Sequence, residues 1–148
     1  MSIKNELNES MKDAMKSGDE VRKRTVRMVL AAVKQSEVDK RTELDDTAVM
    51  NLIQKEMKNR REAVEEAKNA NRADLVQANQ AEIDVLQAFL PKAMPAEELR
   101  SLVEAAIAET GASSPADMGR VMKAVMAKVA GRAPNDQVSA AVRELLQK

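Results

Sequence analysis

The sequence predicts an all-α fold, and three observations lead to that prediction. The 148-residue chain is rich in Ala, Leu, Val, Met, Glu, Lys and Arg but has one Phe and no Trp or Tyr, a composition that favours helices over sheets. Apolar residues recur at helical spacing in seven stretches. Pro91 and Pro95 interrupt the pattern once, because two prolines within five residues prevent a continuous helix. We therefore predict a four-helix N-terminal domain over residues 1–91 and a three-helix C-terminal domain over residues 95–148.

The first two helices have clear boundaries. Ser2 is the expected N-cap of the first helix and Gly18 its stop, while Asp19 is the N-cap of a second helix that runs to about Val38. Segment 20–34 holds five basic residues against one acid, net +4. Cations near a helix N-terminus oppose the macrodipole, so helix stability does not explain them. Ion pairing with other helices and binding of an external anion both remain open. The five basic residues are Arg22, Lys23, Arg24, Arg27 and Lys34.

The third and fourth helices follow a loop at about residues 39–44. Asp45 is the expected N-cap of the third helix, with Leu44 and Val49 placed to form a hydrophobic staple across it. Arg60 falls inside the apolar stripe of this helix, one turn after Glu56, and an Arg60–Glu56 ion pair is the simplest way to accommodate its charge. The segment 69–71 breaks the helix, and a fourth helix follows up to about residue 90.

The C-terminal domain is predicted to hold three helices. The fifth begins at Pro95 or Ala96 and ends at Gly111. The sixth begins with Ser114 as cap and proline at the first helical position, and it ends at Gly131. The seventh follows residue 134.

The sixth helix is predicted to have an apolar face and a basic face. Methionine and valine recur from Met118 to Val129 at helical spacing, which is typical of a face that packs into a core. Four cations are predicted on or beyond the opposite face: Arg120, Lys123, Lys128 and Arg132. An ordinary solvated surface and a set of phosphate contacts are the two interpretations of these residues. With Phe89 as the only aromatic residue, a folded RNA bound through its backbone fits them better than stacked single-stranded bases.

A glycine within the sixth helix is unusual. Gly119 costs about 1 kcal/mol relative to Ala in a helix interior. It either allows a neighbouring helix backbone to pack closely or allows a phosphate to approach.

The composition excludes many kinds of site. Without cysteine or histidine the chain lacks the usual nucleophile, general base and transition-metal ligands, and it has no glycine-rich phosphate loop. We therefore expect no catalytic residue, no metal site and no cofactor. No apolar run reaches the roughly 20 residues that span a bilayer, and the N-terminus does not resemble a signal or transit peptide, so we expect a cytosolic protein without a membrane partner.

These motifs together resemble the YqeY family, the stand-alone relatives of the tail domain of the glutamyl/aspartyl-tRNA amidotransferase B subunit (the GatB/YqeY tail). The resemblance rests on the order and spacing of motifs along essentially the whole chain. In the C-terminal part these are Gly119–Met122, Lys128–Ala133, Val142 and Leu145–Leu146. In the N-terminal part they are Met11–Lys16, Arg22, Arg27, Lys34, Gln54–Glu56, Arg60–Glu62, Arg72–Leu75 and Phe89–Pro91. Pro95 stands where a Ser or Thr cap is expected.

The resemblance implies a two-part helical fold with a GatB-tail-like C-terminal domain. In the amidotransferase complex the tail touches tRNA, whereas ammonia transfer and ATP-dependent activation belong to other domains. The family label of carbon–nitrogen ligase with glutamine as amido-N-donor thus describes a neighbouring enzyme. We expect a non-catalytic tRNA-binding or tRNA-enzyme accessory protein that binds tRNA through Arg120, Lys123, Lys128 and Arg132. Its expected partners are tRNA and a tRNA-dependent amidotransferase or an aminoacyl-tRNA synthetase. The alternatives are a helical protein-interaction adaptor without RNA binding and a free amidotransferase.

Overall fold

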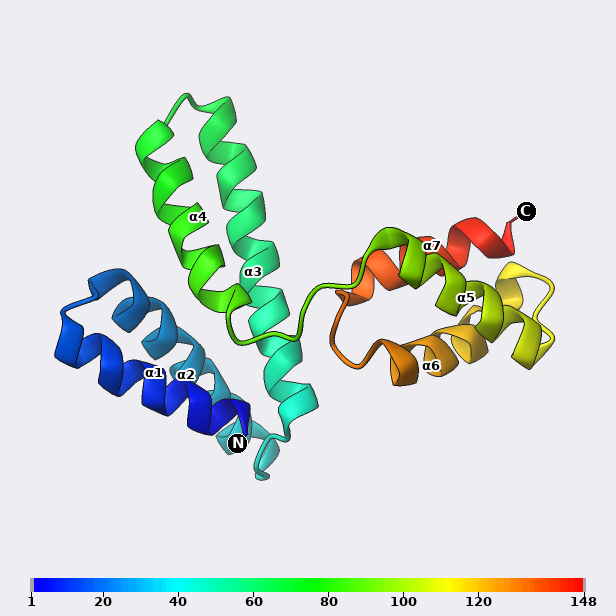
Figure 1. The fold of residues 1–148 in the computed structure, drawn as a ribbon, viewed down its shortest axis with the longest axis horizontal. Helices are drawn as coiled ribbons and strands as arrows, with labels where there is room; N and C mark the ends of the chain where they lie inside the picture. Colours follow the sequence, from blue (N-terminus) through cyan, green and yellow to red (C-terminus); the bar gives the residue numbers. More distant parts are fainter. Residues whose placement is uncertain (1, 148) are drawn as a thin grey trace. The chain divides into compact units, whose positions relative to one another are not determined.

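A computed structural model describes residues 2–147 of the chain. Within this range the chain forms seven α-helices, one short 3₁₀ turn and no strand, which confirms the all-α prediction (Figure 1). The chain divides into two compact units, Met1–Leu90 and Pro91–Lys148. The first unit holds α1 (Ile3–Ser17), α2 (Glu20–Lys40), α3 (Asp46–Asn69) and α4 (Ala73–Gln87). The second holds α5 (Ala96–Thr110), the 3₁₀ turn η1 (Pro115–Asp117), α6 (Met118–Val129) and α7 (Asn135–Leu146).

Side-chain caps fix the starts of the first three helices. Ser2 accepts a hydrogen bond from the backbone N–H of residue 5 at 3.2 Å, Asp19 from residue 22 at 3.1 Å, and Asp45 from residue 48 at 2.9 Å. Each bond satisfies a backbone donor that the first turn of a helix leaves unpaired. Gly18 and Gly111 end their helices in the left-handed region, with φ of 74° and 67°. These predicted boundaries are confirmed.

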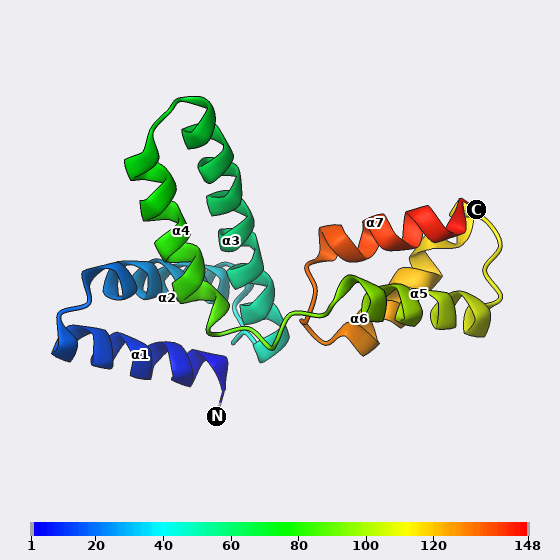
Figure 2. The ribbon, with the colours of Figure 1, turned by 45° about the horizontal axis from the view of Figure 1, so that its top comes forward.

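The first unit consists of two helical hairpins, α1 with α2 and α3 with α4 (Figures 1 and 2). Its core draws apolar side chains from all four helices and from the loop before α3. Both members of the predicted staple, Leu44 and Val49, lie in this core. The buried core residues are Ile3, Leu7, Val26, Val29, Val33, Leu44, Val49, Ile53, Met57, Val64, Ile83 and Leu86.

Arg60 lies at the centre of a buried network of charges in the first unit. Its side chain is 8% exposed, and its Nη1 donates to Glu56 Oε2 at 2.7 Å, which confirms the predicted pair. Its Nε donates to Glu82 Oε2 on α4 at 3.1 Å. The other oxygen of Glu82 accepts a hydrogen bond from Arg24 Nε on α2 at 3.3 Å. The network therefore connects α2, α3 and α4.

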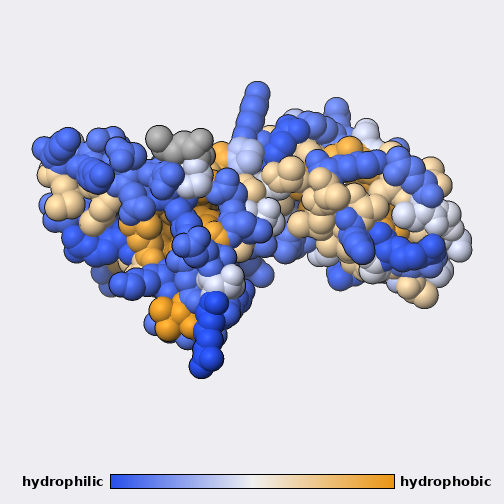
Figure 3. All heavy atoms as spheres, turned by 90° about the horizontal axis from the view of Figure 1, so that it is seen from below, coloured by the Kyte–Doolittle hydropathy of each residue, from blue (hydrophilic) through white to orange (hydrophobic). Residues whose placement is uncertain are grey.

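The second unit packs α5, α6 and α7 around a separate core. Val121, Val125 and Val129 of α6 are fully buried, and the three methionines of α6 pack against this core, as the apolar stripe predicted. The segment before α5 belongs to this unit, because Met94 is buried in its core and the Met94 N–H donates to the Arg132 carbonyl at 2.9 Å. The face drawn in Figure 3 is mostly hydrophilic, with hydrophobic side chains visible between the charged residues.

Four boundaries differ from those predicted. Helix α4 ends at Gln87, before the predicted end at about residue 90. The residues after Ser114 form a 3₁₀ turn, so α6 begins at Met118, because η1 uses the proline and the first carbonyls in tighter i→i+3 bonds. Ala130, with φ of 49°, ends α6 one residue before Gly131. Helix α2 extends to Lys40, and Arg41 caps it in the left-handed region.

Replacing Arg60 with alanine tests the buried network. Arg60→Ala leaves the Glu56 carboxylate without its cation and should lower the free energy of unfolding by about 3 kcal/mol. This is the lower end of the range for breaking a buried pair, since Arg24 still contacts Glu82. Urea denaturation of the full chain measures this change in the free energy of unfolding. The adjacent exposed Arg61→Ala is the control and should change stability by less than about 0.5 kcal/mol. Equal effects of the two substitutions would show that the network contributes nothing.

Candidate nucleic-acid interface

The four cations predicted to bind tRNA lie in the second unit, but they do not form one free basic face. Arg120, Lys123 and Lys128 are on α6, and Arg132 is in the loop between α6 and α7. Lys128 follows the buried Val121 by seven residues, which is about 20° short of two full turns. Its stem therefore starts beside the core stripe, and its side chain is 39% exposed. Lys128 is therefore exposed at the edge of the apolar stripe and not directly opposite it.

Acidic groups hold three of the four cations within the unit. Lys128 Nζ lies 3.0 Å from Glu109 Oε1 at the end of α5. Arg120 donates to Asp117 Oδ1 at 2.7 Å and to the Thr110 carbonyl at 3.2 Å. These contacts join α6 to the C-terminal end of α5.

Arg132 makes the most extensive contacts of the set. Its two terminal nitrogens donate to the two carboxylate oxygens of Glu98 at 2.8 and 3.1 Å, and its Nε donates to the Lys92 carbonyl at 3.1 Å. Paired, parallel hydrogen bonds between guanidinium and carboxylate are the strongest geometry for such a pair. Arg132 thus ties the segment before α5 to the loop after α6.

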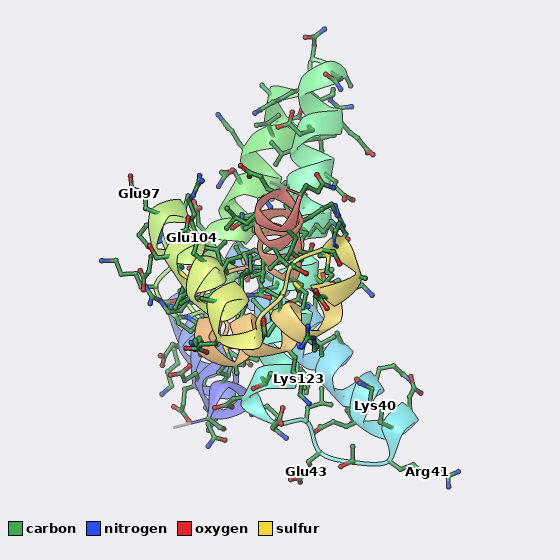
Figure 4. The ribbon with its side chains drawn as sticks, turned by 90° about the vertical axis from the view of Figure 1, so that its right-hand side faces the viewer. Lys40, Arg41, Glu43, Glu97, Glu104 and Lys123 are labelled. Atoms are coloured by element: carbon green, nitrogen blue, oxygen red, sulfur yellow. The ribbon has the colours of Figure 1, made fainter. Side chains whose placement is uncertain are left out.

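Lys123 differs from the other three. It is exposed, and its side chain makes no hydrogen bond or ion pair with residues 2–147 (Figure 4). Gly119, one turn earlier, is also exposed, and a Cβ built on it would meet no atom within 4 Å. Close packing of a neighbouring helix therefore does not explain this glycine. Gly119, Lys123 and the exposed Ala127 form a surface with little side-chain bulk, which we call the open face of α6.

The charge of Asp117 stabilises the start of α6. The Ser113 N–H donates to Asp117 Oδ2 at 3.0 Å, and this bond, together with the Arg120 guanidinium, holds the pKa of Asp117 below its ordinary value of 3.8. A carboxylate at this end also interacts favourably with the helix macrodipole.

The basic segment of α2 divides in the same way. Arg22 lies 3.8 Å from Asp19, and Arg24 pairs with Glu82, so part of this set is engaged in ion pairs. Lys23, Arg27 and Lys34 make no side-chain hydrogen bond or ion pair with the part of the chain that the structure describes. The structure therefore leaves positive charge unneutralised on α2, where sequence reasoning left the two interpretations open.

A shallow groove of about 580 Å³ lies between α5 and α7. Apolar side chains such as Met94, Leu99 and Leu145 line it, and Glu97 and Glu144 are among its charged residues. Carboxylates repel phosphate, so this groove is not part of a phosphate-binding surface.

Residues 2–147 contain no group of three or more acidic, histidine or cysteine side chains placed to hold a metal ion. In the same range no helix is both long enough and apolar enough to cross a membrane.

The pH dependence of stability tests the role of Asp117. Because the folded pKa is depressed, the charge contributes stability that is fully present above 3.8 and is lost as the pH falls through the lower folded value. Asp117→Asn should therefore lower the thermal midpoint at neutral pH, and this difference from the unsubstituted chain should shrink below pH 3.8. The exposed Glu62→Gln, in the middle of α3, is the control and should change the midpoint little at either pH. A deficit of the Asn variant that persists unchanged in acid would contradict the assignment.

Comparison with known proteins adds relatives along the whole chain. "Altered inheritance of mitochondria protein 41, mitochondrial" of Pyrenophora tritici-repentis is 32% identical over 95% of this chain and 78% of its own length. The protein of the same name in Eremothecium gossypii is 36% identical over 70% of this chain and 58% of its own length. An uncharacterized protein of Schizosaccharomyces pombe, C22F3.15, is 26% identical over 58% of this chain and 70% of its own.

These relatives correct one expectation from the sequence. The expected cytosolic location is contradicted, because the Pyrenophora and Eremothecium relatives are both named as mitochondrial proteins. The family itself is shown by a model of the Yqey-like proteins, which matches residues 4–146. The chain therefore belongs to the YqeY-like protein family.

Proposed function

We propose that the chain is a non-catalytic protein that binds tRNA, or assists an enzyme that acts on tRNA, and that its second unit is a GatB-tail-like domain. Membership of the YqeY-like family supports this proposal. The observation that carries it is the open face of α6. There Lys123, a cation without an ion-pair partner among the described residues, lies one turn from Gly119. The space that a side chain at Gly119 would occupy is open. A lysine acts as a point charge for phosphate, and a helical glycine lets a backbone approach closely.

The paired cations of the second unit can join this interface by exchanging partners. Ion pairs this exposed contribute about 0–1 kcal/mol each, so a phosphate can compete with the carboxylate. Arg120 is the most available, since its side chain is 60% exposed. Lys128 can exchange Glu109 for phosphate. Arg132 is the least available, because it holds both oxygens of Glu98 and the Lys92 carbonyl.

The accessory role follows from the chemistry of the chain. With neither cysteine nor histidine, the chain offers no familiar nucleophile–base pair for amide transfer. The partner enzyme, a tRNA-dependent amidotransferase or an aminoacyl-tRNA synthetase, performs the reaction. Glutamine-dependent product formation by the purified chain, given tRNA, ATP and Mg²⁺, would contradict this role.

Neutralising Lys123 tests the open face directly. The dissociation constant of the full chain for total tRNA is measured across a salt series. The slope of log K against log salt then gives the number of phosphate contacts. Lys123→Gln should weaken binding and flatten that slope by about one unit. The matched control is Arg143→Gln, which removes one exposed cation from α7 of the same unit and should have a smaller effect. Equal effects of the two variants would place the contact elsewhere.

Removing a carboxylate tests the exchange of partners. Glu109→Gln frees the Lys128 ammonium, so tRNA binding should become tighter and the salt slope steeper by about one unit. Binding by Glu109→Gln that equals that of the unsubstituted chain would exclude Lys128 from the interface.

Nuclease treatment separates this proposal from a protein-interaction adaptor. Partners that co-purify with the chain through tRNA are lost when the RNA is digested. Enzyme partners that remain after digestion, with no tRNA bound to the purified chain at low salt, would favour the adaptor.

A further inference from the structure

Four cations lie along one face of α2 and its C-terminal cap. Lys23, Arg27, Lys34 and Arg41 are spaced i, i+4, i+11 and i+18, and these steps return to nearly the same side of a helix. At 1.5 Å per residue the row is about 27 Å long. We call these four residues the basic ridge. Figure 4 shows Arg41 at the end of α2 with its side chain directed away from the helix.

No side chain of the basic ridge is neutralised by another described residue. Between residues 2 and 147 none of the four makes a side-chain hydrogen bond or ion pair. Glu37, which follows Lys34 by three residues, is occupied elsewhere, because it accepts bonds from Lys4 Nζ at 2.9 Å and from the Leu44 N–H at 2.7 Å. Asp39 accepts a hydrogen bond from Gln35. The exposed Glu20 and Glu43 lie near the two ends of the ridge and form no ion pair with it. The ridge is therefore a row of four cations that have no ion-pair partner among the described residues.

Helix stability accounts for only part of this arrangement. Lys23 lies in the first turn of α2, where the macrodipole disfavours cations. At the other end the charge of Arg41 interacts favourably with the macrodipole, but its backbone adopts φ 56° and ψ 38°, the left-handed conformation in which glycine is the favoured helix cap. Its backbone N–H caps the Glu37 and Val38 carbonyls, a role that glycine performs without strain.

We propose that the basic ridge of α2 binds the phosphate backbone of an RNA, so that the first unit contributes its own contact surface. This inference rests on the proposed function, that the chain binds tRNA. A row of unpaired cations along one helix face can contact several phosphates of a backbone, and the shortage of aromatic residues excludes base stacking as the main mode. The ridge is not expected to distinguish one RNA sequence from another, because backbone contacts position an RNA without discriminating between bases.

Two triple variants of the full chain test the ridge against total tRNA in a salt series. Lys23→Gln/Arg27→Gln/Lys34→Gln should flatten the slope of log K against log salt by about two units, because each lost phosphate contact contributes about 0.7–0.9. Lys55→Gln/Lys58→Gln/Arg61→Gln on α3 is the matched control. It removes the same charge from exposed residues that have no partner among residues 2–147, and its slope should change by less.

Arg41→Gly separates RNA binding from folding. It relieves the left-handed strain, so its thermal midpoint should equal or exceed that of the unsubstituted chain, while its affinity for tRNA falls several-fold. Loss of binding together with a lowered midpoint would assign Arg41 a structural role and overturn its part in the ridge.

The outcomes distinguish this inference from the proposed function. Undiminished binding by the ridge variant, with the unsubstituted chain binding tRNA, overturns the ridge alone. Failure of the unsubstituted chain to bind tRNA at any salt concentration overturns both. Ridge-dependent binding to phosphatidylserine vesicles in place of tRNA overturns the ridge as an RNA surface.

Discussion

The rotation of α2 about its own axis decides which of its cations reach solvent, and core packing together with a partly buried set of ion pairs holds that rotation. Arg60 contacts one oxygen of Glu82, and Arg24 contacts the other, so α2 is joined to α4 at a defined angle. Val26, Val29 and Val33 fill the core on the other side of the helix. With both sides held, the basic ridge has only the solvent to face. The network therefore acts on function indirectly, by orienting residues that it does not touch.

The two basic helices illustrate how the neighbouring helix determines the meaning of a charge pattern. Helix α6 packs beside α5, which belongs to a segment with four Glu against one Arg, and Glu109 of α5 neutralises Lys128. Arg120 pairs instead with Asp117 of η1, so most cations of α6 are neutralised within the unit. The carboxylates of the first unit are engaged differently, with Glu37 and Glu82 occupied by Lys4, Arg24 and Arg60. An RNA bound as proposed would meet free charge on α2, whereas on α6 it would have to displace a carboxylate at most positions. A phosphate contact with a free cation of α2 strengthens binding without competition from a carboxylate of the chain.

Local features of this chain could be predicted from the sequence because they depend on residues close together in it. The caps at Ser2, Asp19 and Asp45 and the Glu56–Arg60 pair require knowledge of only a few neighbouring positions. The same reasoning failed for Glu82, which lies 22 residues from Arg60 and reaches it only because α3 and α4 fold back on each other. It also failed for α6, since Glu98 and Glu109 come from a different helix and neutralise Arg132 and Lys128. Charge counted along one helix shows where cations are, and tertiary packing determines whether they are free.

The hydrogen bonds of Arg132 also determine where a fragment must begin if it is to keep all the contacts of the second unit. Its guanidinium holds the Lys92 carbonyl and its own carbonyl accepts from the Met94 N–H, so the proline-containing segment is fastened to the three helices that follow it. A fragment that begins at Pro95, where helical periodicity starts, would lose both fastenings and the buried Met94 side chain. A fragment that begins at Pro91 keeps them. The segment from Pro91 to Pro95 is therefore part of the second unit, and a fusion of this unit to another protein should include it.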